Sequence, residues 1–153
     1  MIVTGKGGVG KTTVAAALGA ATAAEGRRAL LVEIARPGRL ASVLEVSGLD
    51  HEPREIREQL WAAKLDEDRC LQALIENLIP VRMLSQRLLS SRSFQVLCAA
   101  IPGILEAALL HRVREFVEES GPDYGGFDLV ILDAPASGHS AVSYTHLTLP
   151  TKA

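Results

Sequence analysis

The stretch Thr4–Thr13, TGKGGVGKTT, decides the fold that this sequence predicts. Four of its ten residues are glycines and two are lysines, so it is not expected to pack as a regular helix or strand. A short β-prone run, Met1–Thr4, leads into it, and an alanine-rich run that ends at Gly26 follows it. Glycine just past such a run is a common helix C-cap, so the predicted order is strand, glycine loop, helix.

Residues Gly5–Thr12 fit the pattern G-x-x-x-x-G-K-[ST] at every fixed position. Glycines in such a loop allow backbone torsions and a close approach that a Cβ would forbid. The backbone N–H groups of Gly8–Thr13 can then converge on a polyphosphate at a helix N-terminus, where the helix dipole favours anions. Lys11 is expected to reach the β- and γ-phosphates, and the Thr12 hydroxyl is expected to ligate Mg²⁺.

A dinucleotide-binding fold is the nearest alternative, because Glu33 follows the loop at about the distance of a ribose-binding acid. The spacing Gly-x-Gly-x-x-Gly is not met cleanly, and the pair Lys11-Thr12 has no role in that fold. A phosphate-binding loop is therefore the favoured interpretation.

Two later runs predict buried strands of a parallel sheet. Arg27–Ile34, RRALLVEI, contains a continuous apolar run and completes a strand–helix–strand unit that should cross over right-handed. Phe127–Pro135, FDLVILDAP, repeats the pattern and places Asp133 at the strand end, where nucleotide-binding sheets hold Mg²⁺-bound water. The loop that follows could sense the terminal phosphate through the Gly138 N–H, with a plain polar strand exit as the alternative.

From about Pro53 to Ser120 the sequence favours helices. REIREQLWAAKL (54–65) and EDRCLQALIENLI (67–79) carry apolar residues at three-and-four spacing, and IPGILEAALLHRVREFVEES (101–120) begins at a Pro-Gly break. The predicted fold is α/β with a mainly parallel sheet and a helix-rich insert, at about 53–120, before the strand that ends at Asp133. The apolar stretch Leu84–Ile101 is interpreted as helix packing, with an exposed groove for a client as the alternative.

Composition sets the class of protein. The chain has 153 residues, of which 48% are hydrophobic and 22% charged, and its formal net charge is −2. One soluble domain is expected, and the lack of excess basic charge argues against nucleic acid as a partner. Cys70 and Cys98 lie far apart and are expected to be reduced core thiols. With no secretory signal and no apolar run of ~18 residues, a cytoplasmic protein is predicted.

The last residues differ in kind from the rest. Val142–Thr151 resembles one reading frame of a common transposase sequencing adapter and follows no helix or strand pattern. We therefore expect the natural sequence to end near Ser140, with residues 141–153 as an artefactual tail. Residues 1–140 would then form a partial domain that lacks its C-terminal part.

The segment Lys6–Thr13, KGGVGKTT, resembles the deviant Walker A loop of the group that contains ParA, MinD and the nitrogenase iron protein. In that group the extra lysine reaches across a homodimer to the partner's phosphates, so turnover follows dimerisation. The resemblance implies this role for Lys6. A solvated loop lysine is the alternative.

Phe127–His139, FDLVILDAPASGH, and Ala99–Leu110, AAIPGILEAALL, are similar to segments of the ArsA-like anion-transporting ATPases. That family also includes the targeting ATPases for tail-anchored membrane proteins. The resemblance implies a P-loop ATPase that uses ATP and Mg²⁺ and closes as a homodimer. It also implies that Asp133–His139 form a second switch. The residues implied to bind phosphate or Mg²⁺ are Gly7, Gly8, Gly10, Lys11, Thr12 and Thr13, with Val9 between them.

One departure concerns the attacking water. The family usually places an Asp after the second strand to position that water, and Ala35 stands there in this chain. Either Glu33 takes over, as favoured here, or hydrolysis is slow and the protein acts as a nucleotide-gated switch. The leading function is an ATPase coupled to an anion, a metalloid or a hydrophobic client protein. The alternatives are a ParA/MinD-type positioning ATPase and a hydrolysis-deficient nucleotide-sensing adaptor.

Overall fold

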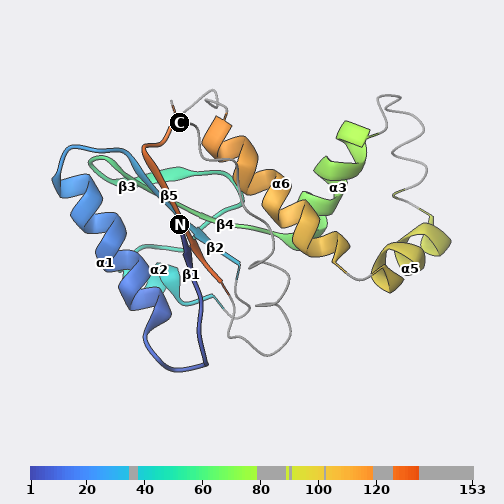
Figure 1. Ribbon diagram of the computed structural model, residues 1–153, viewed down its shortest axis with the longest axis horizontal. Coiled ribbons are helices and arrows are strands. Elements are labelled where there is room, and N and C mark those ends of the chain that lie inside the picture. Colours follow the sequence, from blue (N-terminus) through green and yellow to red (C-terminus); the bar gives the residue numbers. More distant parts are fainter. Residues whose placement is uncertain (35–37, 79–88, 90, 102, 119–125, 135–153) are drawn as a thin grey trace. The chain divides into compact units, whose positions relative to one another are not determined.

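The computed structural model describes residues 1–34, 38–78, 89, 91–101, 103–118 and 126–134 (Figure 1). The chain divides into two units. One comprises Met1–Leu65 and Val113–Ala153, and the other comprises Asp66–Arg112. The first unit contains the sheet and the glycine loop, and it carries the site described below.

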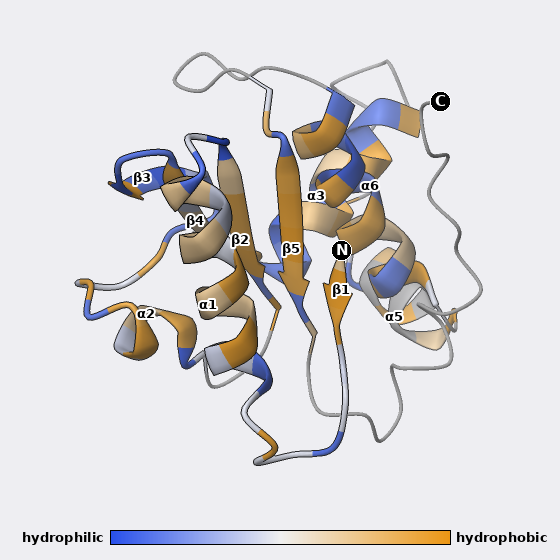
Figure 2. Cartoon of the chain, turned by 60° about the vertical axis from the view of Figure 1, so that its left-hand side comes forward, coloured by the Kyte–Doolittle hydropathy of each residue, from blue (hydrophilic) through white to orange (hydrophobic). Residues whose placement is uncertain are grey.

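A five-stranded sheet with the order β1-β5-β2-β4-β3 forms the centre of the first unit. Its strands are β1 Ile2–Val3, β2 Ala29–Glu33, β3 Arg54–Arg57, β4 Leu60–Lys64 and β5 Leu129–Asp133. The pairs β1–β5, β5–β2 and β2–β4 are parallel, and only the edge pair β3–β4 is antiparallel. Figure 2 shows β1, β5 and β2 side by side. The predicted α/β class with a mainly parallel sheet is confirmed.

Strand β2 is buried along its whole length, as its apolar run predicts for a strand between two parallel neighbours. Its register aligns the strand ends: Glu33 pairs with Asp133 of β5 on one side and with Lys64 of β4 on the other. Three charged residues therefore lie in a row at the carboxyl end of the sheet. Below this row the strand interiors are apolar.

Helix α1, Lys11–Ala24, ends as predicted at a glycine. Gly26 has a φ of 76°. Its N–H donates to the Ala23 carbonyl at 2.9 Å, and the Arg27 N–H donates to the Thr22 carbonyl at 3.2 Å. These two bonds form a Schellman motif, which satisfies carbonyls that a helix end otherwise leaves open.

Gly19 sets how closely α1 approaches the sheet. A Cβ at this position would lie 2.8 Å from Leu31 Cδ2, closer than real Cβ contacts allow, and 3.2 Å from Leu60 Cδ1, which is tighter than most real contacts. The absence of a side chain therefore lets the helix rest directly on β2 and β4. The buried cluster around this contact comprises Ala15, Ala16, Ala29, Leu31, Leu40, Leu44, Leu60, Ala62 and Ile131.

The prediction of a helix over residues 54–65 is wrong, because this segment forms the hairpin β3–β4. The hairpin turns at Glu58-Gln59, with Gln59 at φ 61°. The run Leu60–Ala63 is buried throughout and pairs in parallel with β2. Apolar spacing alone does not separate a short buried strand from a helix, and here pairing with β2 decides the outcome.

A cluster of rings lies at the amino end of the same strands. Trp61 of β4 is buried and meets Phe127 in an edge-on arrangement with 5.6 Å between ring centroids. The Arg28 guanidinium lies 4.7 Å from the Trp61 centroid, and the Arg28 N–H donates to Asp128 Oδ2 at 2.7 Å. These contacts join the starts of β2, β4 and β5 by cation–π and hydrogen-bond interactions.

The helix-rich insert begins at Glu67, later than predicted, because the hairpin occupies the preceding residues. Among its described residues, the helices are α3 Glu67–Leu78, α5 Arg92–Ala100 and α6 Ile104–Glu118. A short helix α2, Leu40–Val43, follows β2. The predicted helices in 67–79 and 101–120 are confirmed. Cys70 is buried in α3. Across the described part of the chain, no helix is long and apolar enough to cross a membrane.

Candidate nucleotide-binding site

The loop between β1 and α1 has the backbone that its glycines predict. Gly5, Gly8 and Gly10 have φ values of 154°, 79° and 85°, which L-residues adopt rarely. A Cβ on Gly8 or Gly10 would meet nothing within 4 Å. Glycine is therefore required at these two positions for its torsion angles and not for lack of space.

The N-terminus of α1 is open. Gly10 is the N-cap, so no side chain caps the helix, and its first turn holds no acidic residue. The first intrahelical bond is made by the Val14 N–H to the Gly10 carbonyl at 3.0 Å. The N–H groups of Lys11, Thr12 and Thr13 therefore lack helical acceptors, and they lie where the helix dipole attracts an anion.

The Lys11 ammonium lies over this loop. Its Nζ donates to the Lys6 carbonyl oxygen at 3.0 Å, which bends the side chain back across the glycines. Lys6 itself is exposed to solvent, as are Gly7, Gly8 and Val9. The loop thus combines backbone donors that lack helical acceptors with one ammonium held against the loop at the Lys6 carbonyl.

Asp133 is the acidic residue that the structure brings to the loop. It pairs with Val3 of β1, and the Ala134 N–H donates to the Val3 carbonyl at 3.1 Å, just before the glycine loop begins. The carboxylate is 2% exposed, and neither oxygen has a hydrogen-bond partner among the described residues. A buried carboxylate without a donor is costly unless a cation or its bound water compensates it. This arrangement fits Mg²⁺, with the half-buried Thr12 at the same end of α1.

Glu33 behaves differently, although it lies next to Asp133 in the register. It is 1% exposed, and its Oε1 accepts hydrogen bonds from the N–H groups of Arg39 at 2.5 Å and Leu40 at 2.8 Å. Sequence reasoning singled out Glu33 but missed Arg39 and Leu40. Gly38, just before these two residues in the sequence, was the available signal, since glycine permits a close approach of the backbone.

Three predicted features lie outside the described residues. Gly138 and the rest of the second switch fall within 135–153, and Ala35 falls within 35–37. The sensing role of Gly138, the missing Asp at Ala35 and the artefactual tail therefore stay predictions.

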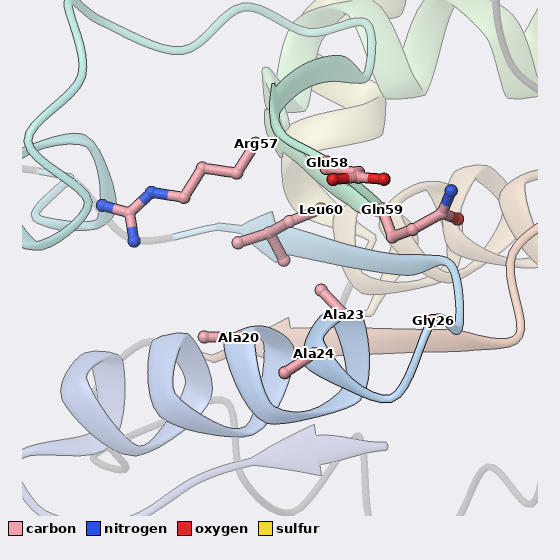
Figure 3. A pocket seen from close by; sticks show the side chains of 8 residues that line it. All are labelled: Ala20, Ala23, Ala24, Gly26, Arg57, Glu58, Gln59 and Leu60. Carbon is pink, nitrogen blue, oxygen red and sulfur yellow. The ribbon is translucent and has the colours of Figure 1, made fainter.

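A cavity of about 400 Å³ lies elsewhere in the first unit, between the C-terminal part of α1 and the β3–β4 hairpin (Figure 3). Its lining residues are Ala20, Ala23, Ala24, Gly26, Arg57, Glu58, Gln59 and Leu60. It contains no residue of the glycine loop or of the charged row at the strand ends. The candidate site is therefore the loop and not this cavity.

Four features together define a P-loop nucleotide-binding domain: a mainly parallel sheet, a glycine loop with left-handed torsions, an uncapped helix N-terminus and a buried Asp on the adjacent strand. Residues 1–152 match the model of the anion-transporting ATPase family, and the chain belongs to this ArsA ATPase family.

Curated relatives agree with this assignment. The chain is 27% identical over 146 residues to the ATPase BagA of Mycobacterium tuberculosis, an alignment that covers 92% of this chain and 43% of the relative. It is 28% identical over 149 residues to a Halobacterium salinarum protein whose name describes an arsenical pump-driving ATPase. That alignment covers 92% of this chain and 22% of the relative. The chain therefore spans less than half the length of these relatives.

Proposed function

We propose that this chain is the nucleotide-binding part of a Mg²⁺-dependent ATPase that hydrolyses ATP. The observation that carries the proposal is the open N-terminus of α1, where left-handed glycines leave the N–H groups of Lys11–Thr13 without helical acceptors. Membership of the ATPase family supports ATP as the anion that binds there.

The side chains would divide the work as follows. The backbone N–H groups of Gly7–Thr13 bind the phosphates, and Lys11 exchanges its contact with the Lys6 carbonyl for the β- and γ-phosphates. The Thr12 hydroxyl would ligate Mg²⁺, and Asp133 would accept hydrogen bonds from its bound water. When bound, Mg²⁺ neutralises charge that develops on the phosphates.

Dimerisation is the second part of the proposal. Lys6 is exposed, its backbone carbonyl accepts the hydrogen bond from Lys11, and no contact of its ammonium is seen among the described residues. This leaves its ammonium available to a partner's nucleotide, as the resemblance to the deviant loop group implies. A homodimer that closes on ATP would supply Lys6 in trans and stabilise the transition state. Gly138 would act as the sensor of the terminal phosphate in the second switch.

The coupled process is proposed as handling of an anion, a metalloid or a hydrophobic client, in the cytoplasm. The name of the Halobacterium relative favours an arsenical. The second unit favours a hydrophobic client, because Leu78, Val96 and Ile101 are 71%, 63% and 45% exposed. The ParA/MinD-type positioning ATPase and the hydrolysis-deficient adaptor remain the alternative functions.

Steady-state turnover and equilibrium binding of ATP by the natural full-length protein would test the proposal. Tight Mg²⁺-ATP binding with measurable phosphate release is expected, and Lys6→Ala should reduce turnover while ATP still binds. Binding without turnover would favour the adaptor. Absence of ATP binding in magnesium buffer would refute the proposed function.

A further inference from the structure

Glu33 makes a contact for which a role in activating water gives no reason. Its Oε1 accepts two backbone hydrogen bonds, from Arg39 and Leu40, which lie six and seven residues further along the chain. A charged acceptor shared by two N–H groups is among the stronger contacts available to a buried carboxylate. The carboxylate thereby ties the returning segment to the end of β2.

The other oxygen of the same carboxylate is closed off by Gly38. A Cβ on Gly38 would lie 2.3 Å from Glu33 Oε2 and 3.1 Å from Lys64 Nζ. A side chain at position 38 would therefore displace the carboxylate, which its two hydrogen bonds from Arg39 and Leu40 hold in place. With Glu33 only 1% exposed, both sides of the carboxylate are occupied by protein.

Leu40 couples this contact to the phosphate loop. Its N–H is held by Glu33, while its fully buried side chain belongs to the core cluster that contains Ala15 and Ala16, in the first half of α1. Helices α1 and α2 are in contact. Where Glu33 holds Leu40 therefore determines how α2 packs beside the helix that begins at the glycine loop.

We propose that Glu33 is a positioning residue, which clamps Gly38–Leu40 to the carboxyl end of the sheet and so sets how α2 packs against α1, the helix that begins at the glycine loop. It does not take a proton from water or orient the attacking water. Its effect on turnover rests on the proposed ATPase function, whereas the clamp itself does not. Gly38 is the complementary half of the clamp, because its lack of a side chain lets the segment close.

Amide hydrogen exchange of the nucleotide-free protein tests the clamp directly. In Glu33→Ala, the amides of Arg39 and Leu40 should exchange about tenfold faster or more, since each loses a charged acceptor. Glu33→Gln keeps an acceptor oxygen, so its exchange should stay within about threefold of the parent protein. Gly38→Ala should accelerate exchange as Glu33→Ala does, because its Cβ displaces the carboxylate.

Glu55→Ala is the matched control. Glu55 is also an acid that accepts a backbone hydrogen bond, from the Gln59 N–H at 3.3 Å, but it lies on the exposed hairpin. Its removal should leave exchange at Arg39 and Leu40 unchanged. If Glu33→Ala does not fold, Gly38→Ala and Glu33→Gln still decide the question.

Kinetics separate positioning from water activation. A positioning residue predicts that Glu33→Gln keeps kcat within about threefold, while Glu33→Ala and Gly38→Ala lose about tenfold with little change in KM. Equal loss of kcat in Glu33→Gln and Glu33→Ala would overturn the proposal, and so would unchanged exchange in both Glu33→Ala and Gly38→Ala. Failure of the parent protein to bind ATP would refute the ATPase proposal and leave the exchange result standing.

Discussion

The two ends of helix α1 differ in how their backbone groups are satisfied. At the C-terminal end, Gly26 and Arg27 return hydrogen bonds to Ala23 and Thr22. At the N-terminal end, Gly10 adopts a nearly identical torsion, with φ 85° against 76° at Gly26, yet no side chain caps the helix. The same glycine chemistry closes one end and leaves the other open. An unsatisfied end on an otherwise well-packed element marks the place where a ligand completes the structure.

The carboxyl end of the sheet repeats this contrast with two acids. Glu33 and Asp133 are neighbours in register and almost fully buried. Glu33 has backbone donors, whereas Asp133 has no partner among the described residues. Burial alone therefore does not separate a structural carboxylate such as Glu33 from a candidate ligand-binding one such as Asp133. Their hydrogen-bond partners do.

Replacing Lys11 at the open end of α1 is expected to have the largest effect on ATP binding. Lys11→Ala deletes the ammonium above the loop, and ATP affinity is expected to fall by about 100-fold or more, measured by titration with a fluorescent ATP analogue. Arg27→Ala, at the closed end of the same helix, removes an exposed ion pair with Glu25 and should leave the affinity unchanged. Equal affinities in the parent protein and Lys11→Ala would contradict the site.

Asp133→Asn should separate function from stability. Turnover is expected to fall by about 100-fold with ATP affinity largely retained, because the change removes the acceptor charge for Mg²⁺-bound water. The nucleotide-free protein should not lose Tm, since the variant relieves a buried, uncompensated charge. A fall in Tm without loss of turnover would show that Asp133 is structural.

Gly19→Val tests the close contact between the middle of α1 and the sheet. The new side chain would overlap Leu31 and Leu60, so we expect a loss of about 2–3 kcal/mol in the free energy of unfolding, measured by urea denaturation. Ala17→Val on the exposed face of the same helix should cost only about 0.5 kcal/mol, from helix propensity. Similar losses at the two positions would mean that the contact with the sheet is not tight.

Gly26→Ala and Gly10→Ala compare the two ends of α1 directly, and their expected effects on stability are the smallest. Each forces a left-handed torsion on alanine in open space, so each should cost about 1 kcal/mol in stability. Only Gly10→Ala should also weaken ATP binding. Matching losses of stability with a binding defect confined to Gly10→Ala would confirm that only the open end of the helix binds nucleotide. A binding defect in Gly26→Ala would break the distinction.

Much of this fold could be predicted because its signals are local. The glycine loop, the C-cap at Gly26 and the apolar runs of β2 and β5 each lie within a few adjacent residues. The hairpin β3–β4 could not be predicted in the same way. The run Leu60–Ala63 becomes a strand because β2 offers it a parallel partner that lies far away in the sequence.

The candidate site could likewise be predicted only where its signals are local in the sequence. Lys11, Thr12 and Asp133 follow from a motif and a strand end, and the structure brings them to one end of the sheet. The state of each carboxylate did not follow from the sequence. The partners of Glu33 are the backbone N–H groups of Arg39 and Leu40, and although Gly38 allows a close approach there, no side chain in the sequence identifies which amides donate.

The ring cluster at the amino end of the strands has a practical consequence. Trp61 is the only tryptophan in the chain, and it lies in β4 against Arg28 and Phe127. Its intrinsic emission is therefore an optical signal from one place, where the starts of β2, β4 and β5 meet. Quenching or a red shift of the Trp61 fluorescence on heating would report that the starts of these three strands separate. It would not report structural changes at the glycine loop.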